Sequence, residues 1–215
     1  MNIEYFLNIH EFYFRLALLF IFLSPLYWNI VGRVEYQTHF ISKLVGDPLT
    51  AVYIFGISIF LLSSYRNWIF EIALKSQPKF EPFDNSIIHL LGWICLIIGL
   101  ILVLGSFYRL GFVNTYLGDY FGFLLSRKIE SFPFSIVQNP MYWGSSLNFI
   151  GTSLIHSSLA GIVLSVWIWI VYRIAIMFEE PFTEYIYSQS NINKSASNGD
   201  LTSKSKIVKR AQKIE

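Results

Sequence analysis

Three long stretches without a charged residue constrain this chain more than any other feature. Pro48–Tyr65, Asn85–Tyr108 and Ser131–Tyr172 contain no Asp, Glu, Lys or Arg. A helix of about 20 mostly apolar residues spans the hydrocarbon core of a bilayer, so each stretch is long enough to hold a crossing. Only 14% of the residues are charged, whereas soluble domains carry about a quarter. The sequence therefore predicts an all-α integral membrane protein.

The number of crossings depends on a shorter apolar stretch near the N-terminus, Leu16–Gly32, which carries Pro25 near its middle. A proline removes a helical hydrogen bond and tends to kink the helix. We expect this stretch either to cross the bilayer or to enter it and return. In the last of the long stretches we place the helix at about His156–Phe178. The expected fold class is an all-α membrane protein with three to four transmembrane helices, of which the first either crosses the bilayer or forms a re-entrant segment.

Basic residues predict the orientation, because Lys and Arg collect on the cytoplasmic side. With three crossings, the loop Arg66–Lys79 shares a side with Arg173 and the C-terminal tail, and together they hold ten basic residues. The segments Arg33–Lys43 and Arg109–Lys128 hold five on the other side. The C-terminus is therefore expected to face the cytosol.

The composition changes after Tyr187, where Ser, Asn and Lys predominate and too few apolar residues remain to bury a core. We expect a membrane-embedded domain over residues 1–187 and a disordered basic cytosolic tail over 188–215. The net charge is +2, and no basic patch alternates with aromatic residues, which argues against nucleic-acid binding. No His, Cys or carboxylate group has metal-ligand spacing, so no metal is expected.

Two adjacent carboxylates, Glu179 and Glu180, end the last apolar stretch and are followed by Pro181. Ionisable residues at membrane depth tend to be functional, although a pair at a helix end can also be solvated. Pro181 is expected to stop the helix and hold both carboxylates in a defined turn.

A second candidate region is rich in Gly, Tyr and Trp and covers Gly111–Gly151. Asp119 lies in it between glycine and tyrosine, and Tyr142 follows an Asn-Pro pair. The aromatic faces could bind a cation, or they could anchor an interfacial loop. His156 follows this region, and a lone histidine at a helix end is more often structural than catalytic. Small residues in Gly99–Phe107 indicate close helix packing.

Several spaced motifs resemble one family in the same order. They are "SPLYWNIVGRVEYQT", "LKSQPKF", "GFVNTYLGDYFG", "FPFSIVQNPMYWGSS" and "FEEPFTEYIY". Together they resemble the phosphatidylethanolamine N-methyltransferases, integral membrane enzymes that make phosphatidylcholine. The resemblance runs from about Pro25 to Tyr187. It implies transfer of methyl groups from S-adenosylmethionine to phosphatidylethanolamine and then to its methylated derivatives. The implied location is the endoplasmic reticulum membrane, with the mitochondria-associated membrane as a second candidate.

The resemblance also implies a cofactor site made by Ile97, Ile98 and Gly99 together with Glu179 and Glu180. The family often has glycine at the first of these positions, where this chain has isoleucine. S-adenosylmethionine carries positive charge, so carboxylates at a cytosolic opening suit it through charge-assisted hydrogen bonds.

The lipid amine must lose a proton before it attacks the methyl group. The candidate bases or orienting groups are Glu180, His156, Tyr142 and Asp119. Much of the rate would come from holding the two substrates in line.

Two other functions remain open from the residues. A related membrane enzyme methylates the carboxylate of isoprenylcysteine, but that family usually has Arg-His-Pro where this chain has Gln138-Asn139-Pro140. A small transporter is the other alternative, because Pro-x-Tyr-Trp occurs twice and could mark two broken helices. The charged pair lies at a helix end and not at mid-bilayer, which argues against transport.

Overall fold

The computed structural model describes residues 7–211, with side chains described up to Ile192. Every regular element in this part of the chain is helical, so the all-α prediction is confirmed. The chain divides into two compact units, Met1–Met177 and Phe178–Glu215. Each is described by itself.

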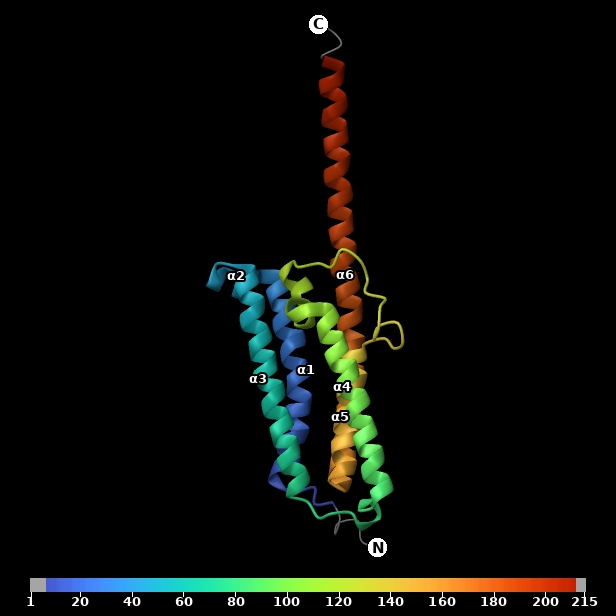
Figure 1. Ribbon diagram of the computed structural model, residues 1–215. Helices are drawn as coiled ribbons and strands as arrows, with labels where there is room; N and C mark the ends of the chain where they lie inside the picture. Colours follow the sequence, from blue (N-terminus) through green and yellow to red (C-terminus); the bar gives the residue numbers. More distant parts are fainter. Residues whose placement is uncertain (1–6, 212–215) are drawn as a thin grey trace. The chain divides into compact units, whose positions relative to one another are not determined.

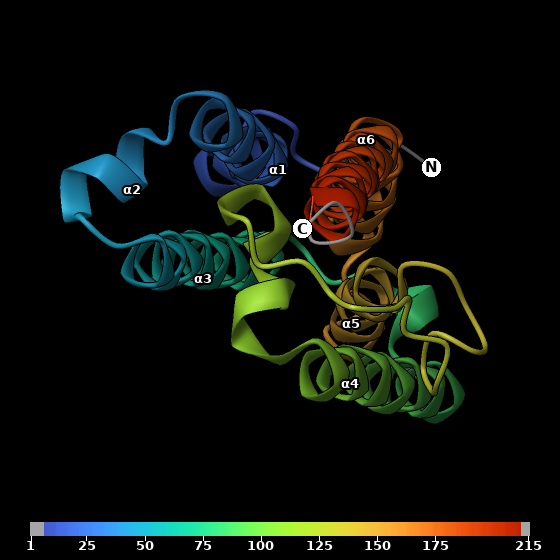
Figure 2. The same cartoon turned by 90° about the horizontal axis from the view of Figure 1, so that it is seen from above.

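The five longest helices of the described part form a bundle in the first unit and alternate in direction (Figure 1). They are α1 (Phe12–Thr38), α3 (Pro48–Lys75), α4 (Ser86–Thr115), α5 (Pro140–Ile155) and the beginning of α6 (Leu159–Ala211). Seen from above, α1 lies beside α3 and α4 beside α5 (Figure 2). Four of them, α1, α3, α4 and α6, are long and apolar enough to cross a membrane.

The connections gather at two ends of this unit. We call one the loop end, where α2 (Phe40–Val45) and η3 (Gly118–Phe121) lie within the connections 39–47 and 116–139. The other, the N-terminal end, holds η2 (Glu81–Phe83) and the segments 7–11, 76–85 and 156–158. Hydrogen bonds join the segments of the N-terminal end, since Asn8 N donates to Gln77 Oε1 at 2.8 Å and Phe80 N donates to Ser157 O at 2.8 Å.

Helix α1 is continuous over 27 residues although Pro25 lies inside it. At a rise of about 1.5 Å per residue it measures about 40 Å, which exceeds a hydrocarbon core of about 30 Å. The carboxylate of Glu11 begins the helix by accepting a hydrogen bond from Phe14 N at 2.6 Å. Of the two alternatives left open by the sequence, the structure favours a full crossing over a re-entrant segment.

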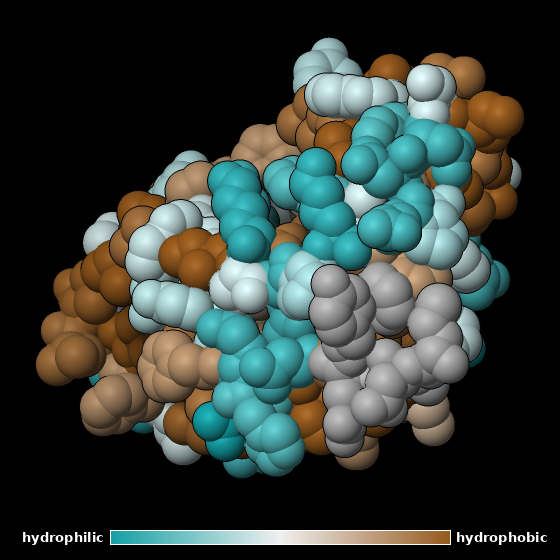
Figure 3. Space-filling view, turned by 90° about the horizontal axis from the view of Figure 1, so that it is seen from below, coloured by the Kyte–Doolittle hydropathy of each residue, from teal (hydrophilic) through white to brown (hydrophobic). Residues whose placement is uncertain are grey.

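The interior is apolar, and so is much of the exterior. The fully buried core combines side chains from α1, α3 and α6, namely Ala17, Ile21, Ile69, Ala73, Leu164 and Ile168. Large apolar residues such as Leu61 and Leu104 are more than half exposed on the helix flanks. Seen from below, hydrophilic side chains cover the end face and hydrophobic ones lie along its flanks (Figure 3). Exposed apolar surface of this extent marks contact with lipid or a partner, and the long apolar helices identify lipid.

The expected grouping of the loops is wrong in one respect. The long stretch Ser131–Tyr172 contains two antiparallel helices and not one crossing, because the chain reverses at Ser157, whose φ is 51°. The connection after α3 therefore lies at the N-terminal end, from which α6 starts and runs toward the loop end. The expected grouping of Arg66–Lys79 with Arg173 does not hold within the first unit, because Lys79 lies where α6 starts and Arg173 lies about four turns further along α6.

The turn expected at Pro181 is also absent, since α6 continues through this residue. Proline lacks the N–H that would bond the carbonyl four residues earlier, at Met177, and such a loss kinks a helix without having to end it. The division between the two compact units follows Met177. Residues 188–211, where the composition predicts disorder, have a helical backbone. Their role as a basic cytosolic tail stays a prediction, and residues 212–215 lie outside the described part.

Candidate functional site

Glycines bring α4 and α5 into direct backbone contact. A Cβ atom on Gly99 would lie 2.6 Å from the carbonyl oxygen of Gly144, and one on Gly92 would lie 2.9 Å from that of Gly151. The two glycines of each helix are seven residues apart, so they fall on one face about two turns apart. No larger residue fits at this distance. The close packing predicted for Gly99–Phe107 is therefore confirmed at Gly99.

The three residues implied for the cofactor point in different directions. Gly99 faces α5, whereas Ile97 is 53% exposed on the outer surface of α4. Ile98 lines a pocket. The structure thus assigns Gly99 a packing role of its own, and the cofactor role of all three residues stays a prediction.

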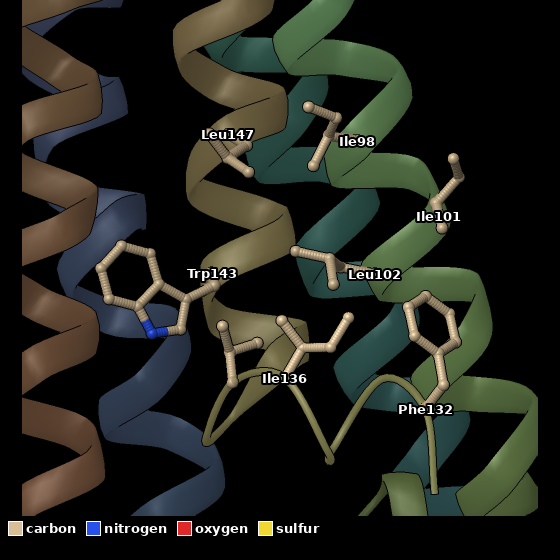
Figure 4. Close-up of a pocket in the computed structure, with 8 residues that line it drawn as sticks. Ile98, Ile101, Leu102, Phe132, Ile136, Trp143 and Leu147 are labelled. Carbon is tan, nitrogen blue, oxygen red and sulfur yellow. The ribbon is translucent and has the colours of Figure 1, made fainter.

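That pocket has a volume of about 390 Å³ and was not foreseen from the sequence. It lies between α4, α5 and the segment before α5 (Figure 4). Only apolar and aromatic side chains line it: Ile98, Ile101, Leu102, Phe132, Ile136, Val137, Trp143 and Leu147. Ile101 is 50% exposed and Trp143 is 45% exposed, so the pocket opens on the apolar flank of the unit. The one signal in the sequence was the apolar run "FPFSIV" between polar residues.

Tyr142 belongs to an aromatic cluster around a buried cation. Its ring packs edge-on against Tyr172, with 5.0 Å between the ring centroids. The hydroxyl of Tyr172 accepts a hydrogen bond from Arg66 Nη1 at 3.0 Å. The guanidinium also lies 5.3 Å from the centroid of the Phe149 ring. Arg66 is buried, and its Nε atom has no hydrogen-bond partner among the described residues.

Arg66 is not among the site residues predicted from the sequence, because it directly follows a charge-free stretch and marks the end of that stretch. Charged residues inside transmembrane helices usually face the bundle interior and mark functional positions. This position is a lone arginine within a 28-residue helix, which is the signal that could have found it.

Asp119 and His156 lie at opposite ends of the first unit. Asp119 is in η3 at the loop end of the unit. His156 is the C-cap residue of α5 and lies at the N-terminal end of the unit, where its Nδ1 is 2.9 Å from Thr152 O. No single site can contain both side chains. Tyr142 lies in the first turn of α5, at the other end of this helix from His156.

Glu179 and Glu180 lie on α6 in the second unit, immediately before Pro181. Because the helix continues, the pair has helical geometry, in which adjacent side chains diverge by about 100°. The two carboxylates therefore leave the helix in different directions, which differs from the turn expected from the sequence.

Another carboxylate, that of Glu35, is fully buried near the loop end. It accepts hydrogen bonds from Ile41 N at 2.7 Å and from Ser42 N at 3.2 Å, and a further one from the Ser42 hydroxyl. These bonds hold the start of α2 against the end of α1. The carboxylate of Glu35 thus has a structural role.

Comparison with known proteins identifies the chain. Residues 87–190 match the family model described as phospholipid methyltransferase. The chain is 47% identical to phosphatidylethanolamine N-methyltransferase of Mus musculus, over 82% of this chain and 88% of that protein. It is 42% identical to phosphatidylethanolamine N-methyltransferase A of Dictyostelium discoideum, over 91% and 93%. It is 44% identical to phosphatidyl-N-methylethanolamine N-methyltransferase of Schizosaccharomyces pombe, over 81% and 90%.

No solved structure matches the chain. The similarity to these relatives extends over most of both partners in each comparison. It favours a lipid methyltransferase over the two alternatives raised by the sequence, a carboxyl methyltransferase and a transporter. The chain therefore belongs to the phospholipid methyltransferase family.

Proposed function

We propose that this membrane-embedded phospholipid methyltransferase converts phosphatidylethanolamine, through its mono- and dimethyl derivatives, to phosphatidylcholine. The observation that carries the proposal is the nearly full-length similarity to relatives named for two of these substrates. The Mus musculus relative is named for phosphatidylethanolamine and the Schizosaccharomyces pombe relative for the monomethylated lipid.

The methyl donor in this proposal is S-adenosylmethionine. Its positive charge fits the chemistry of Glu179 and Glu180, which would bind it with Ile97, Ile98 and Gly99 contributing from α4. In each step the protonated amine first gives up a proton, the freed lone pair of the nitrogen attacks the methyl carbon, and the bond from that carbon to sulfur breaks. The protein's part is to hold both substrates in line and to exclude water.

The proton acceptor is proposed from the remaining candidates. Tyr142 is our first choice in the bundle interior, and Asp119 and Glu180 are the carboxylates that could receive the proton near water. His156 would serve only an amine that reacts at the N-terminal end, where its ring nitrogen lies against Thr152 O.

We further propose that the loop end faces the cytosol in the endoplasmic reticulum membrane, with the mitochondria-associated membrane as a second location. The five basic residues of Arg33–Lys43 and Arg109–Lys128 belong to the loop end. One crossing by α6 adds Arg173 and the tail, with seven more. The N-terminal end holds only Arg15, Lys75 and Lys79, because Arg66 is buried inside the bundle. This division of basic residues between the two sides favours a cytosolic tail more strongly than the ten-to-five division expected from the sequence.

The test is a methylation assay with membranes that contain the full chain and radiolabelled S-adenosylmethionine. Phosphatidylethanolamine and its mono- and dimethyl derivatives are supplied separately. Label in all three product lipids supports the proposal. Label only with the methylated substrates would restrict the enzyme to the later steps, and label in protein alone would overturn it.

A further inference from the structure

The pocket beside α4 has the form of a lipid-chain site. Its three α4 residues are Ile98, Ile101 and Leu102, and all of its lining is apolar or aromatic. It opens on a flank whose exposed side chains are themselves apolar. Water gains few hydrogen bonds in such a pocket, so an apolar chain is the occupant that stabilises it.

A basic residue lies on the same face of α4, nearer the loop end. Ile98, Leu102, Gly105 and Arg109 follow at intervals of four, three and four residues, which places them in one stripe along the helix. Seven residues separate Leu102 from Arg109, or about 10 Å along the axis. The exposed side chain of Arg109 thus lies at the end of the pocket that is closer to the membrane surface.

A hydrogen bond connects Arg109 to Phe132, one of the residues that line the pocket. Arg109 Nε donates a hydrogen bond to the carbonyl oxygen of Phe132 at 3.3 Å. Gly105 lets the segment lie directly on α4, since a Cβ there would be 3.3 Å from the Phe132 ring and 3.4 Å from Pro133. Among the described residues no carboxylate pairs with Arg109, so its two terminal nitrogens are available to an anion.

We infer that this pocket and Arg109 form the binding site for the phospholipid substrate, with one acyl chain in the pocket and the phosphodiester on the guanidinium. Arginine binds phosphate oxygens with two parallel hydrogen bonds. The order along α4, charge at the loop end and apolar lining deeper, is that of a lipid in the leaflet at the loop end. This inference rests on the proposed function for the identity of the lipid.

The site also gives a route for substrate entry. Ile101 and Trp143 border the opening from two helices and are about half exposed to the bilayer. A lipid can therefore move in sideways without leaving the membrane. The amine, which is joined to the phosphate through two carbons, would then lie at the loop end.

The experiment uses the full chain in nanodiscs that contain phosphatidylethanolamine with a photoreactive group in one acyl chain. Ile101→Trp fills the pocket, and Leu104→Trp places the same side chain on an exposed position of α4 outside it. We expect Ile101→Trp to lose most of the crosslink to the pocket residues and to raise the KM for lipid about tenfold. The KM for S-adenosylmethionine should stay within about twofold, and Leu104→Trp should match the wild type in all three.

The phosphate contact is tested with Arg109→Gln and Arg109→Lys, and with Arg15→Gln as the matched change of an exposed arginine on α1. We expect Arg109→Gln to raise the lipid KM about tenfold, Arg109→Lys to recover part of the loss, and Arg15→Gln to have no effect. Inorganic phosphate added before irradiation should not lower the yield of the crosslink. A lower yield would indicate a general anion site and overturn the inference.

The outcomes separate this inference from the proposed function. A wild-type protein that methylates lipid while Ile101→Trp keeps the crosslink and the lipid KM would overturn the inference alone. A wild-type protein that methylates no lipid would overturn the function, whatever the crosslink shows. If Ile101→Trp fails to insert, Ile101→Ser, which adds a polar group without bulk, should still raise the lipid KM, and an unchanged value would count against the site.

Discussion

Arg66 and Tyr172 are joined by a hydrogen bond of 3.0 Å between Nη1 and the phenolic hydroxyl, in the interior of the first unit. They come from α3 and α6, which are 106 positions apart at this contact. Both side chains are buried, and no carboxylate neutralises Arg66 among the described residues. Aromatic rings replace the missing anion in part, through cation–π contacts with Phe149 and Tyr172.

This arrangement predicts an unequal response to two substitutions. Tyr172→Phe leaves the cation in place and removes the acceptor of Nη1, which should lower the free energy of unfolding by about 2 kcal/mol. Arg66→Met replaces the cation by an apolar chain of similar length, and such replacements are often neutral or stabilising. Unfolding in mixed micelles measures both. A larger loss for Arg66→Met would mean that the guanidinium packing, and not its charge balance, decides the stability.

Gly99 has a packing role and a proposed cofactor role. A matched substitution at Gly92, which has only the packing role, distinguishes the two. Gly99→Ala and Gly92→Ala each place a Cβ within 3 Å of a carbonyl oxygen of α5. Overpacking of this kind costs about 1–3 kcal/mol, so both variants should lose stability to a similar degree. We expect only Gly99→Ala to raise the KM for S-adenosylmethionine as well. Equal KM values in the two variants would leave Gly99 with packing alone.

The carboxylate pair predicts a loss of cofactor affinity. Glu179→Gln and Glu180→Gln each remove one charge while keeping the size of the side chain. Hydrogen bonds to charged groups are worth about 1.5–3 kcal/mol, so kcat/KM for S-adenosylmethionine should fall by at least about tenfold. Because adjacent helical positions diverge, the two losses should be unequal. Glu184→Gln is the control from the same segment, and near-normal kinetics in both test variants would remove the pair from the site.

Much of the fold could be predicted because membrane helices are recognised by one local property, the absence of charge over about 20 residues. That property also caused the main error. Ser131–Tyr172 is a single charge-free stretch, but the chain reverses inside it at Ser157, which is neither a glycine nor a proline. Ser157 O also accepts a hydrogen bond from Phe80 N, a residue 77 positions earlier, and no local pattern reveals such a contact.

The site was less predictable for a similar reason. The lining of the pocket comes from three segments, and the role of Gly105 is visible only when Phe132 lies against it. At Pro181 the local rule that proline ends a helix gave a wrong prediction, because α6 continues there without the lost hydrogen bond. Motifs in series identified the family, but distances in the bundle were needed to separate Asp119 from His156.

The pH dependence of stability has one well-defined contributor outside the membrane-spanning helices. Asp47 begins α3, and its pKa is held below the ordinary 3.8 by hydrogen bonds from the side chain and backbone of Thr50. A carboxyl group with a lowered pKa stabilises the fold when the pH is above its ordinary pKa. This contribution disappears as the pH falls through the lowered pKa of the folded protein. The thermal midpoint of Asp47→Ala should therefore lie below that of the wild type at pH 6 to 7. The difference should shrink below about pH 4, and a constant difference would assign it to helix propensity.

The proposed orientation predicts different modification at the two termini. The sequon Asn193-Lys194-Ser195 lies in the C-terminal part of α6, and a cytosolic tail cannot receive an N-linked glycan there. The N-terminal segment lies at the opposite end of the first unit, since Asn8 is bonded to Gln77. A sequon tag added at the N-terminus should therefore be glycosylated in microsomes, while Asn193 is not. Asn193→Gln should then leave the electrophoretic mobility unchanged. The reverse pattern, with a glycan on Asn193 and none on the tag, would place the loop end and the proposed lipid phosphate in the lumenal leaflet.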